Sequence, residues 1–199
     1  MIAIFDYGAG NLRSVQNTLD ELSCQYTLVR DSEGLRQATR ILLPGVGHFG
    51  QMMRALDSLD VRSALTERIA AGVPFFGICL GMQALFQTSE EAADVRGLGV
   101  FPGEVKRFPV GPRVPHMGWN ELEPRPSSRL IANLNARPYV YFAHSYYVPK
   151  SDLASAICTY DLPYTAALES GNVYGVQFHP EKSGSVGLQI VRNFLELPC

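Results

Sequence analysis

The chain has 199 residues, of which 46% are hydrophobic and 18% charged, and its formal net charge is −2 at pH 7. This composition is typical of one globular domain over residues 1–199, and a chain of this length buries about 70% of its unfolded surface. The small negative charge gives no basis for binding nucleic acid or an anionic membrane, and no apolar run reaches the length of a membrane span, so neither is expected as a partner.

The first half of the chain alternates short apolar stretches with amphipathic ones. The apolar stretches predict β-strands over residues 2–5, 26–29, 41–43 and 75–78. Helical periodicity covers residues 12–22, 52–59 and 61–71. Asn11 is placed to cap the first of these helices. Strands that alternate with helices predict a parallel sheet covered by helices on both faces.

The second half consists of short strands and turns. Strands are expected over residues 97–101, 104–107, 139–142, 154–159, 166–169 and 173–178. Residues 186–197 predict an amphipathic C-terminal helix, and residues 109–115 and 124–128 are expected to be irregular. The sequence therefore predicts an α/β domain whose mainly parallel sheet has helices on both faces and added antiparallel strands.

Residues 75–83 read FFGICLGMQ, an apolar strand that runs into a helical pattern with a cysteine at the junction. A strand that turns directly into a helix strains the junction residue, and Gly77 and Gly81, two positions to either side, leave room for that turn. The side chain then stands at the positive end of a helix, which favours a thiolate. Cys79 is therefore the candidate nucleophile, although a lone cysteine after an apolar strand is ordinarily a small core residue.

Residues 175–183 read GVQFHPEKS, a second strand that ends in a histidine, a proline and a glutamate. A thiol nucleophile needs a base that takes its proton and returns it to the leaving group, and the base needs a third group that fixes its tautomer. His179 and Glu181 flank a proline of restricted φ, so both can project from one strand end. We assign His179 as the base and later acid, and Glu181 as the group that orients it.

Two other segments carry weaker chemical signals. Gly8 and Gly10 lie between a strand and a helix, as in nucleotide-binding loops, but the third glycine of that motif is missing. His144 and Ser145 are adjacent, and neighbouring residues of a strand point to opposite faces. The histidine therefore cannot easily activate the serine.

The cysteines are scattered and form no C-x-x-C pair, so they suggest neither a zinc site nor a disulfide framework. They are Cys24, Cys79, Cys158 and Cys199. No metal is expected, and a reducing cytoplasm fits this cysteine usage best.

Residues 77–83 (GICLGMQ) and 178–181 (FHPE) together resemble the triad, or class I, glutamine amidotransferases, which hydrolyse glutamine to glutamate and ammonia. Further segments resemble the glutaminase subunits of imidazole glycerol phosphate synthase. These are residues 6–11 (DYGAGN), 44–47 (PGVG), 115–120 (PHMGWN) and 182–183 (KS). The resemblance covers essentially the whole chain, and it implies a flavodoxin-like three-layer domain without a metal or organic cofactor.

The resemblance also implies roles for single residues. Acyl transfer passes through an oxyanion that needs two backbone donors: the elbow supplies the Leu80 amide, and the family's oxyanion strand matches Val46 and Gly47. The implied glutamine-binding positions are Gly45, Gln83, Ser145 and Tyr146. The implied partner-interface positions are Asn11, Met117, Trp119, Tyr141 and Lys182.

We therefore expect an enzyme that hydrolyses glutamine through a glutamyl thioester on Cys79. By resemblance, it forms a heterodimer with a cyclase subunit, a (β/α)8 barrel that uses the ammonia to make imidazole glycerol phosphate in histidine biosynthesis. One alternative is the glutaminase subunit of another pathway, such as anthranilate or pyridoxal phosphate synthesis, which has no match to residues 116–119. Another is a catalytically silent module that regulates a partner, against which the intact Cys, His and Glu set argues.

Overall fold

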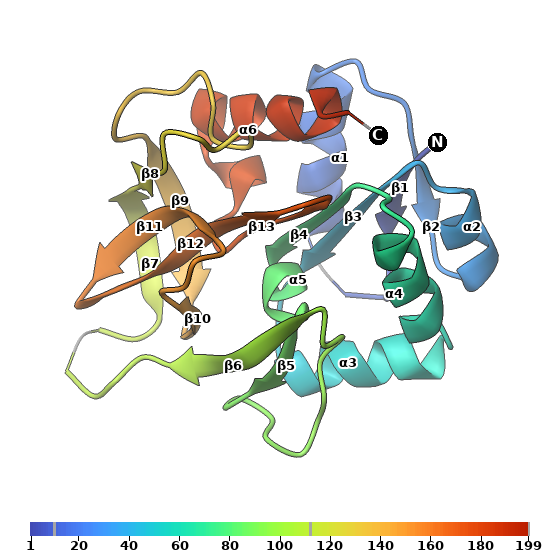
Figure 1. Ribbon diagram of the computed structural model, residues 1–199, viewed down its shortest axis with the longest axis horizontal. Helices are drawn as coiled ribbons and strands as arrows, with labels where there is room; N and C mark the ends of the chain where they lie inside the picture. Colours follow the sequence, from blue (N-terminus) through green and yellow to red (C-terminus); the bar gives the residue numbers. More distant parts are fainter. Residues whose placement is uncertain (10, 112, 199) are drawn as a thin grey trace.

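The computed structural model describes residues 1–9, 11–111 and 113–198. Within them, one half of the central sheet is parallel (Figure 1). Its strands are β1 (Ile2–Phe5), β2 (Tyr26–Val29), β3 (Arg40–Gly45), β4 (Phe75–Cys79) and β13 (Val173–Val176). They lie in the order β2-β1-β3-β4-β13. Because parallel strands end at the same edge, Gly45 and Cys79 are register partners at the carboxyl ends of β3 and β4.

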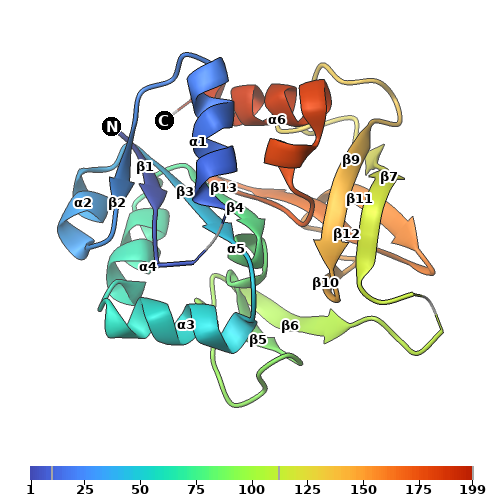
Figure 2. The same ribbon diagram turned by 180° about the vertical axis from the view of Figure 1, so that it is seen from behind.

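Helices cover both faces of this parallel half (Figures 1 and 2). Ala3 and Phe5 belong to one buried cluster and Ile4 to the other, as successive residues of a strand point to opposite faces. The first cluster is closed by α2 (Ser32–Gln37), α3 (Phe49–Ser58) and α4 (Arg62–Ala70), the second by α1 (Leu12–Glu21) and α6 (Gly184–Glu196). Among the described residues, no helix combines the length and the apolar character needed to cross a bilayer.

Beyond β13 the sheet continues with mainly antiparallel strands. These are β12 (Leu162–Ser170), β10 (Tyr146–Pro149), β6 (Phe101–Arg107) and β5 (Phe86–Ser89), with β11 (Ala154–Tyr160) and β8 (Glu123–Pro124) branching from β12. A separate antiparallel pair consists of β7 (His116–Glu121) and β9 (Tyr139–His144). The predicted fold class, a three-layer α/β domain with added antiparallel strands, is confirmed.

The predicted helices are present with ends shifted by a few residues, but one predicted strand is wrong. Of residues 97–101, only Phe101 lies in a strand. The amides of Gly97 and Gly99 donate to Gln87 O and Phe86 O of β5, and Gly99 has φ +67°, so these residues form an irregular segment beside that strand. The elements α2, β5, β7, β8 and β10 were not expected, because their stretches are short and lack clear apolar alternation.

The predicted capping role of Asn11 is also wrong. Asn11 precedes α1, but its side chain makes no capping hydrogen bond. Its φ and ψ are −85° and 56°, outside the extended conformation from which a cap side chain reaches back to the helix amides. The Asn11 carbonyl instead accepts hydrogen bonds from the amides of Ser14 and Val15.

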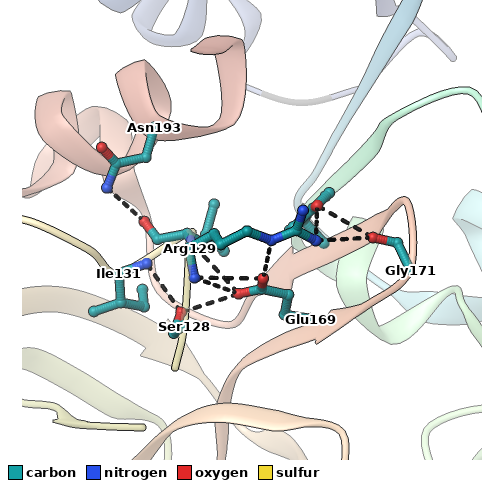
Figure 3. A network of polar contacts seen from close by, with 8 residues as sticks. Ser128, Arg129, Ile131, Glu169, Gly171 and Asn193 are labelled. Atoms are coloured by element: carbon teal, nitrogen blue, oxygen red, sulfur yellow. Dashed lines mark hydrogen bonds and ion pairs between the residues drawn. The ribbon is translucent and has the colours of Figure 1, made fainter. Parts of the chain in front are cut away.

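The irregular segment after β8 is held by side chains of β12 and α6 (Figure 3). Glu169 of β12 accepts hydrogen bonds from Ser128 Oγ and Arg129 Nε, each at 3.0 Å. Asn193 of α6 donates to Leu130 O at 2.9 Å. Residues 125–128 are irregular, as expected, and their neighbours bind both the sheet and α6.

Candidate active site

The chain turns at Cys79 directly from β4 into α5 (Leu80–Gln83). Cys79 has φ 55° and ψ −110°, a conformation that costs a non-glycine residue on the order of 1–3 kcal/mol. A Cβ atom on Gly77 would lie 2.5 Å from Gly81 O, and one on Gly81 would lie 1.8 Å from Leu43 O. Close backbone packing therefore requires both glycines, and the strained turn expected from the sequence is confirmed.

The helix after this turn is short. α5 has four residues, and the next carbonyl, that of Ala84, accepts a hydrogen bond from the amide of Leu98 at 2.7 Å. The chain then enters β5 at Phe86. One helical turn aligns few peptide dipoles, so the groups that pack directly against the sulfur govern its electrostatics more than the helix does.

His179 and Glu181 lie together, although not on a strand end as expected. β13 ends at Val176, and Pro180 begins a 3-10 turn, η1 (Pro180–Lys182), that brings the carboxylate back to the ring. His179 Nδ1 lies 2.8 Å from Glu181 Oε1, and both side chains are buried. The His179 amide donates to Tyr141 O at 2.9 Å, which anchors this segment to β9.

The surroundings of His179 favour its charged form. Burial alone would lower the pKa of the ring, but hydrogen bonds to the Cys79 sulfur and to Glu181, with the negative charges of both groups, raise it from 6.5 to about 10. The ring is therefore an imidazolium at neutral pH. It lies between the sulfur on one side and the carboxylate on the other.

A cavity of about 290 Å³ opens beside Cys79 and His179. Of the four predicted glutamine-binding residues, Gln83, Ser145 and Tyr146 line this cavity. Gly45 is not among its lining residues in the described part of the chain. A Cβ on Gly45 would lie 2.7 Å from Gly81 N, so its place in the fold is a close backbone contact beneath the elbow.

The predicted oxyanion loop borders the same cavity, since Val46, Gly47 and Leu80 are lining residues. The amide of Val46 donates to the hydroxyl of Tyr7 at 3.1 Å, and that hydroxyl lies 3.2 Å from Val46 O, to which it donates. Tyr7 lines a neighbouring cavity of about 240 Å³. The Val46 amide is therefore committed to a partner that does not line the Cys79 cavity. Gly47 has φ +96°, which only glycine adopts without strain.

Most of the predicted interface residues form one surface at the mouth of the cavity. Met117 and Lys182 line the cavity, and the side chains of Met117 and Trp119 are 64% and 56% exposed. The ring of Tyr141 lies 6.1 Å from the ring of Trp119 and 5.7 Å from Lys182 Nζ. Asn11, at the start of α1, does not line the cavity.

Two residues of the site were not predicted from the sequence. Gln177 Nε2 lies 3.7 Å from Cys79 Sγ, and Tyr7 holds the oxyanion loop. Gln177 had a detectable signal, because it lies two positions before His179 in the predicted strand 173–178 and alternate residues of a strand share a face. Tyr7 had none, since its contact with Val46 joins residues 39 apart in the chain.

His144 is part of a buried network rather than a base for Ser145, as expected. Its Nδ1 lies 2.8 Å from Tyr146 O and its Nε2 3.2 Å from the hydroxyl of Tyr164. The same hydroxyl lies 3.2 Å from His116 Nδ1. Burial lowers the pKa of His144 to about 3 and that of His116 to about 4, so both rings are neutral.

The sequence family described as glutamine amidotransferase class-I matches residues 3–197. A protein of Methanothermobacter thermautotrophicus named imidazole glycerol phosphate synthase subunit HisH is 46% identical, over 99% of this chain and 98% of that protein. Proteins of the same name from Moorella thermoacetica and Bacillus cereus are 46% and 43% identical, each over 98% of this chain, and over 94% and 93% of their own lengths.

Solved structures with low sequence identity share the fold. A structure titled "Crystal structure of glutamine amidotransferase" matches with a TM-score of 0.78 at 21% identity, covering 98% of this chain and 97% of the other. The structure of PurLQS from Thermotoga maritima matches with a TM-score of 0.76 at 20% identity, covering 98% and 96%. At such identities the similarity supports the architecture alone.

Proposed function

Since this chain belongs to the class-I glutamine amidotransferases and is nearly half identical to HisH proteins along its whole length, we propose that it is the glutaminase subunit of an imidazole glycerol phosphate synthase. It hydrolyses glutamine to glutamate and ammonia and delivers the ammonia to a cyclase subunit in histidine biosynthesis. The observation that carries the proposal is the buried set of Cys79, His179 and Glu181 beside a cavity of amino-acid size.

The first half-reaction forms a thioester. The sulfur of Cys79 attacks the carboxamide carbon of glutamine, and the carbonyl electron pair moves onto oxygen. When the tetrahedral intermediate collapses, the C–N bond breaks and the nitrogen takes a proton from the His179 imidazolium, so that ammonia leaves. The raised pKa of His179 supplies that proton at neutral pH.

The second half-reaction releases glutamate. A water molecule gives a proton to the now neutral His179 and attacks the thioester carbon, and the C–S bond then breaks to restore the sulfur. Glu181 accepts a hydrogen bond from Nδ1 throughout, which directs Nε2 toward the sulfur and stabilises the imidazolium. Glu181 is therefore an orienting group and is not consumed as a base.

Polar groups that line the cavity bind the glutamine substrate. Both hydrogens of Gln83 Nε2 go to Tyr146 O and Gln177 Oε1, so its Oε1 is left to accept from the α-ammonium group of glutamine. The backbone around Ser145 and Tyr146 completes the site for the amino-acid end. Leu80 supplies one oxyanion amide, and the loop of Val46 and Gly47 supplies the other once Val46 leaves Tyr7.

The cyclase partner binds at the mouth of the cavity, on the surface formed by Met117, Trp119, Tyr141 and Lys182, and Asn11 at the start of α1 is a further expected contact. Exposed Met and Trp side chains are typical of interface centres, and Lys182 adds a charge beside them. Docking there covers the cavity and keeps ammonia from water. We place the protein in the cytoplasm, where a reducing environment preserves the thiol of Cys79.

The test is a glutaminase assay of the chain co-purified with a barrel cyclase subunit. Glutamate formation should rise when the cyclase's nucleotide substrate is added, and imidazole glycerol phosphate should form from glutamine or from ammonium salt. A complex that makes the product from ammonium alone, with no glutamine hydrolysis under any condition, would exclude the proposed function.

A further inference from the structure

We propose that Gln177 is a positioning residue for the reaction of the proposed glutaminase: its side-chain amide holds the Cys79 sulfur through an N–H donor whose direction is set by Gln83 and the Tyr146 carbonyl. The inference rests on the proposed function, which does not itself require Gln177.

The contacts form one buried chain. Gln177 Nε2 lies 3.7 Å from Cys79 Sγ, and Gln177 Oε1 accepts from Gln83 Nε2 at 2.9 Å. Gln83 Nε2 also donates to Tyr146 O at 3.0 Å. Gln177 is fully buried and Gln83 is 4% exposed, so water does not compete for these groups.

The Tyr146 carbonyl determines which end of the Gln83 side-chain amide, and then of the Gln177 side-chain amide, is the NH₂ group. The Tyr146 carbonyl can only accept, so it fixes the NH₂ end of the Gln83 amide. The second hydrogen of that NH₂ group then requires an acceptor, which is Gln177 Oε1. Gln177 must therefore present its own NH₂ group to the sulfur. The reversed amide would place two donors against each other beside Gln83 and an oxygen against the sulfur.

The backbone holds Gln177 in a fixed place relative to the base. Its amide donates to Ala166 O of β12 at 2.8 Å, and His179 follows two positions later in the same segment. Residues 177 and 178 form a bend directly after β13, and the side chains of Gln177 and His179 both reach Cys79 from this short segment. The sulfur is thus held by a neutral donor and a charged one.

This neutral donor adds to the charged one whenever the sulfur becomes negative. When the thioester is hydrolysed, His179 has taken a proton from water, and the sulfur leaves as a thiolate between the imidazolium and the Gln177 amide. An N–H group from Gln177 stabilises the negative sulfur without exchanging a proton. Hydrogen bonds to a charged partner are stronger than neutral ones, and a low local dielectric strengthens them further.

The test measures the sulfur directly and needs no glutamine. The rate at which iodoacetamide alkylates Cys79 is followed by mass spectrometry of its peptide from acid to alkaline pH, in the wild type and in Gln177→Met, which keeps the volume and removes the donor. The pH midpoint of Cys79 alkylation should rise by about one unit in Gln177→Met, since a lost charged hydrogen bond corresponds to about a tenfold change in equilibrium. Gln37→Met, on the exposed face of α2, is the matched control and should leave the midpoint in place.

A second variant, Gln177→Glu, tests the same donor if Gln177→Met does not fold. It is nearly isosteric, keeps the oxygen that Gln83 donates to, and replaces the donor by an oxygen, so its midpoint should rise at least as far. In complex with the cyclase subunit, both variants should lose about tenfold in kcat/KM for glutamine while ammonium-dependent synthesis is unchanged. A midpoint that stays at the wild-type value in folded Gln177→Met or Gln177→Glu overturns the inference. A shifted midpoint in a protein whose wild-type complex hydrolyses no glutamine would support the positioning role and reject the proposed function.

Discussion

The hydroxyl of Tyr7 bridges the backbone of Val46, accepting from its amide at 3.1 Å and donating to its carbonyl across 3.2 Å. Burial raises the pKa of Tyr7 to about 12, against the opposing effect of the Val46 hydrogen bond, so the phenol keeps its proton and both contacts at neutral pH. While they last, the Val46 amide cannot serve an oxyanion beside Cys79. The contact therefore holds the loop in a state in which the Val46 amide is already occupied.

Tyr7→Phe should raise the glutaminase activity of the isolated chain. The substitution removes one oxygen and both contacts with Val46, and Gly47 lets the peptide rotate at little steric cost. One oxyanion donor contributes roughly 3–4 kcal/mol, so the gain can reach about a hundred- to a thousandfold and the stimulation by the partner should shrink accordingly. Glutamate release is measured without the cyclase subunit, with Tyr26→Phe on β2 as the matched control. Unchanged or lower basal activity in Tyr7→Phe would show that Tyr7 does not restrain the loop.

The charge on His179 should depend on Cys79. Burial opposes the charge, and the hydrogen bond with Cys79 is the largest effect that raises the pKa of His179 to about 10. In Cys79→Ala that bond and its charge are gone, so the pKa should fall, and in Glu181→Gln it should also fall. Imidazole ¹⁵N chemical shifts across pH report the titration. An unmoved titration in Cys79→Ala would mean that the ring and the sulfur are not paired.

The turn at Cys79 should tolerate no side chain at Gly81. Its added Cβ would lie 1.8 Å from Leu43 O, so strand β3 and the elbow would have to separate, and overpacking of this kind costs about 3 kcal/mol or more. Gly99→Ala is the control, because Gly99 has φ +67° but nothing within 4 Å of a Cβ, and it should cost only about 1 kcal/mol of backbone strain. Urea unfolding compares the two variants. Equal losses would show that the backbone contact can relax.

The neutral pair His116 and His144 should make the protein sensitive to acid. Their pKa values of about 4 and about 3 lie below the unfolded value of 6.5, so neither histidine affects stability above pH 6.5. Below it, the unfolded chain binds protons that the folded chain excludes, and each histidine lowers the free energy of unfolding by about 1.4 kcal/mol per pH unit until its folded pKa is reached. Between pH 6.5 and 4.5, His116→Gln should lose stability less steeply than the wild type. The same slope in both proteins would contradict the assignment of a buried neutral ring.

Local patterns predicted the parts of the site that depend on short segments. The elbow at Cys79 follows from an apolar run and two glycines, and His179 with Glu181 from one tripeptide. The backbone conformation expected around His179 was wrong, because Pro180 starts a 3-10 turn where an extended strand end was predicted. Contacts between distant segments gave no signal: Tyr7 meets Val46, and Gln83 meets Gln177, only after β1, β3, β4 and β13 are assembled in register. The pairing of β7 with β9 was missed for the same reason, since neither its partner nor its exposed side can be read from residues 116–121 alone.

Cys79 is the residue on which the proposed chemistry depends, and one comparison isolates its role. The complex of Cys79→Ala with the cyclase subunit is assayed for glutamate formation from glutamine and, in parallel, for imidazole glycerol phosphate formation from ammonium salt. Glutamine hydrolysis should fall by about a thousandfold or more, because no thioester can form, while ammonium-dependent synthesis should continue at the wild-type rate. Appreciable glutamine hydrolysis by Cys79→Ala would contradict the proposed chemistry.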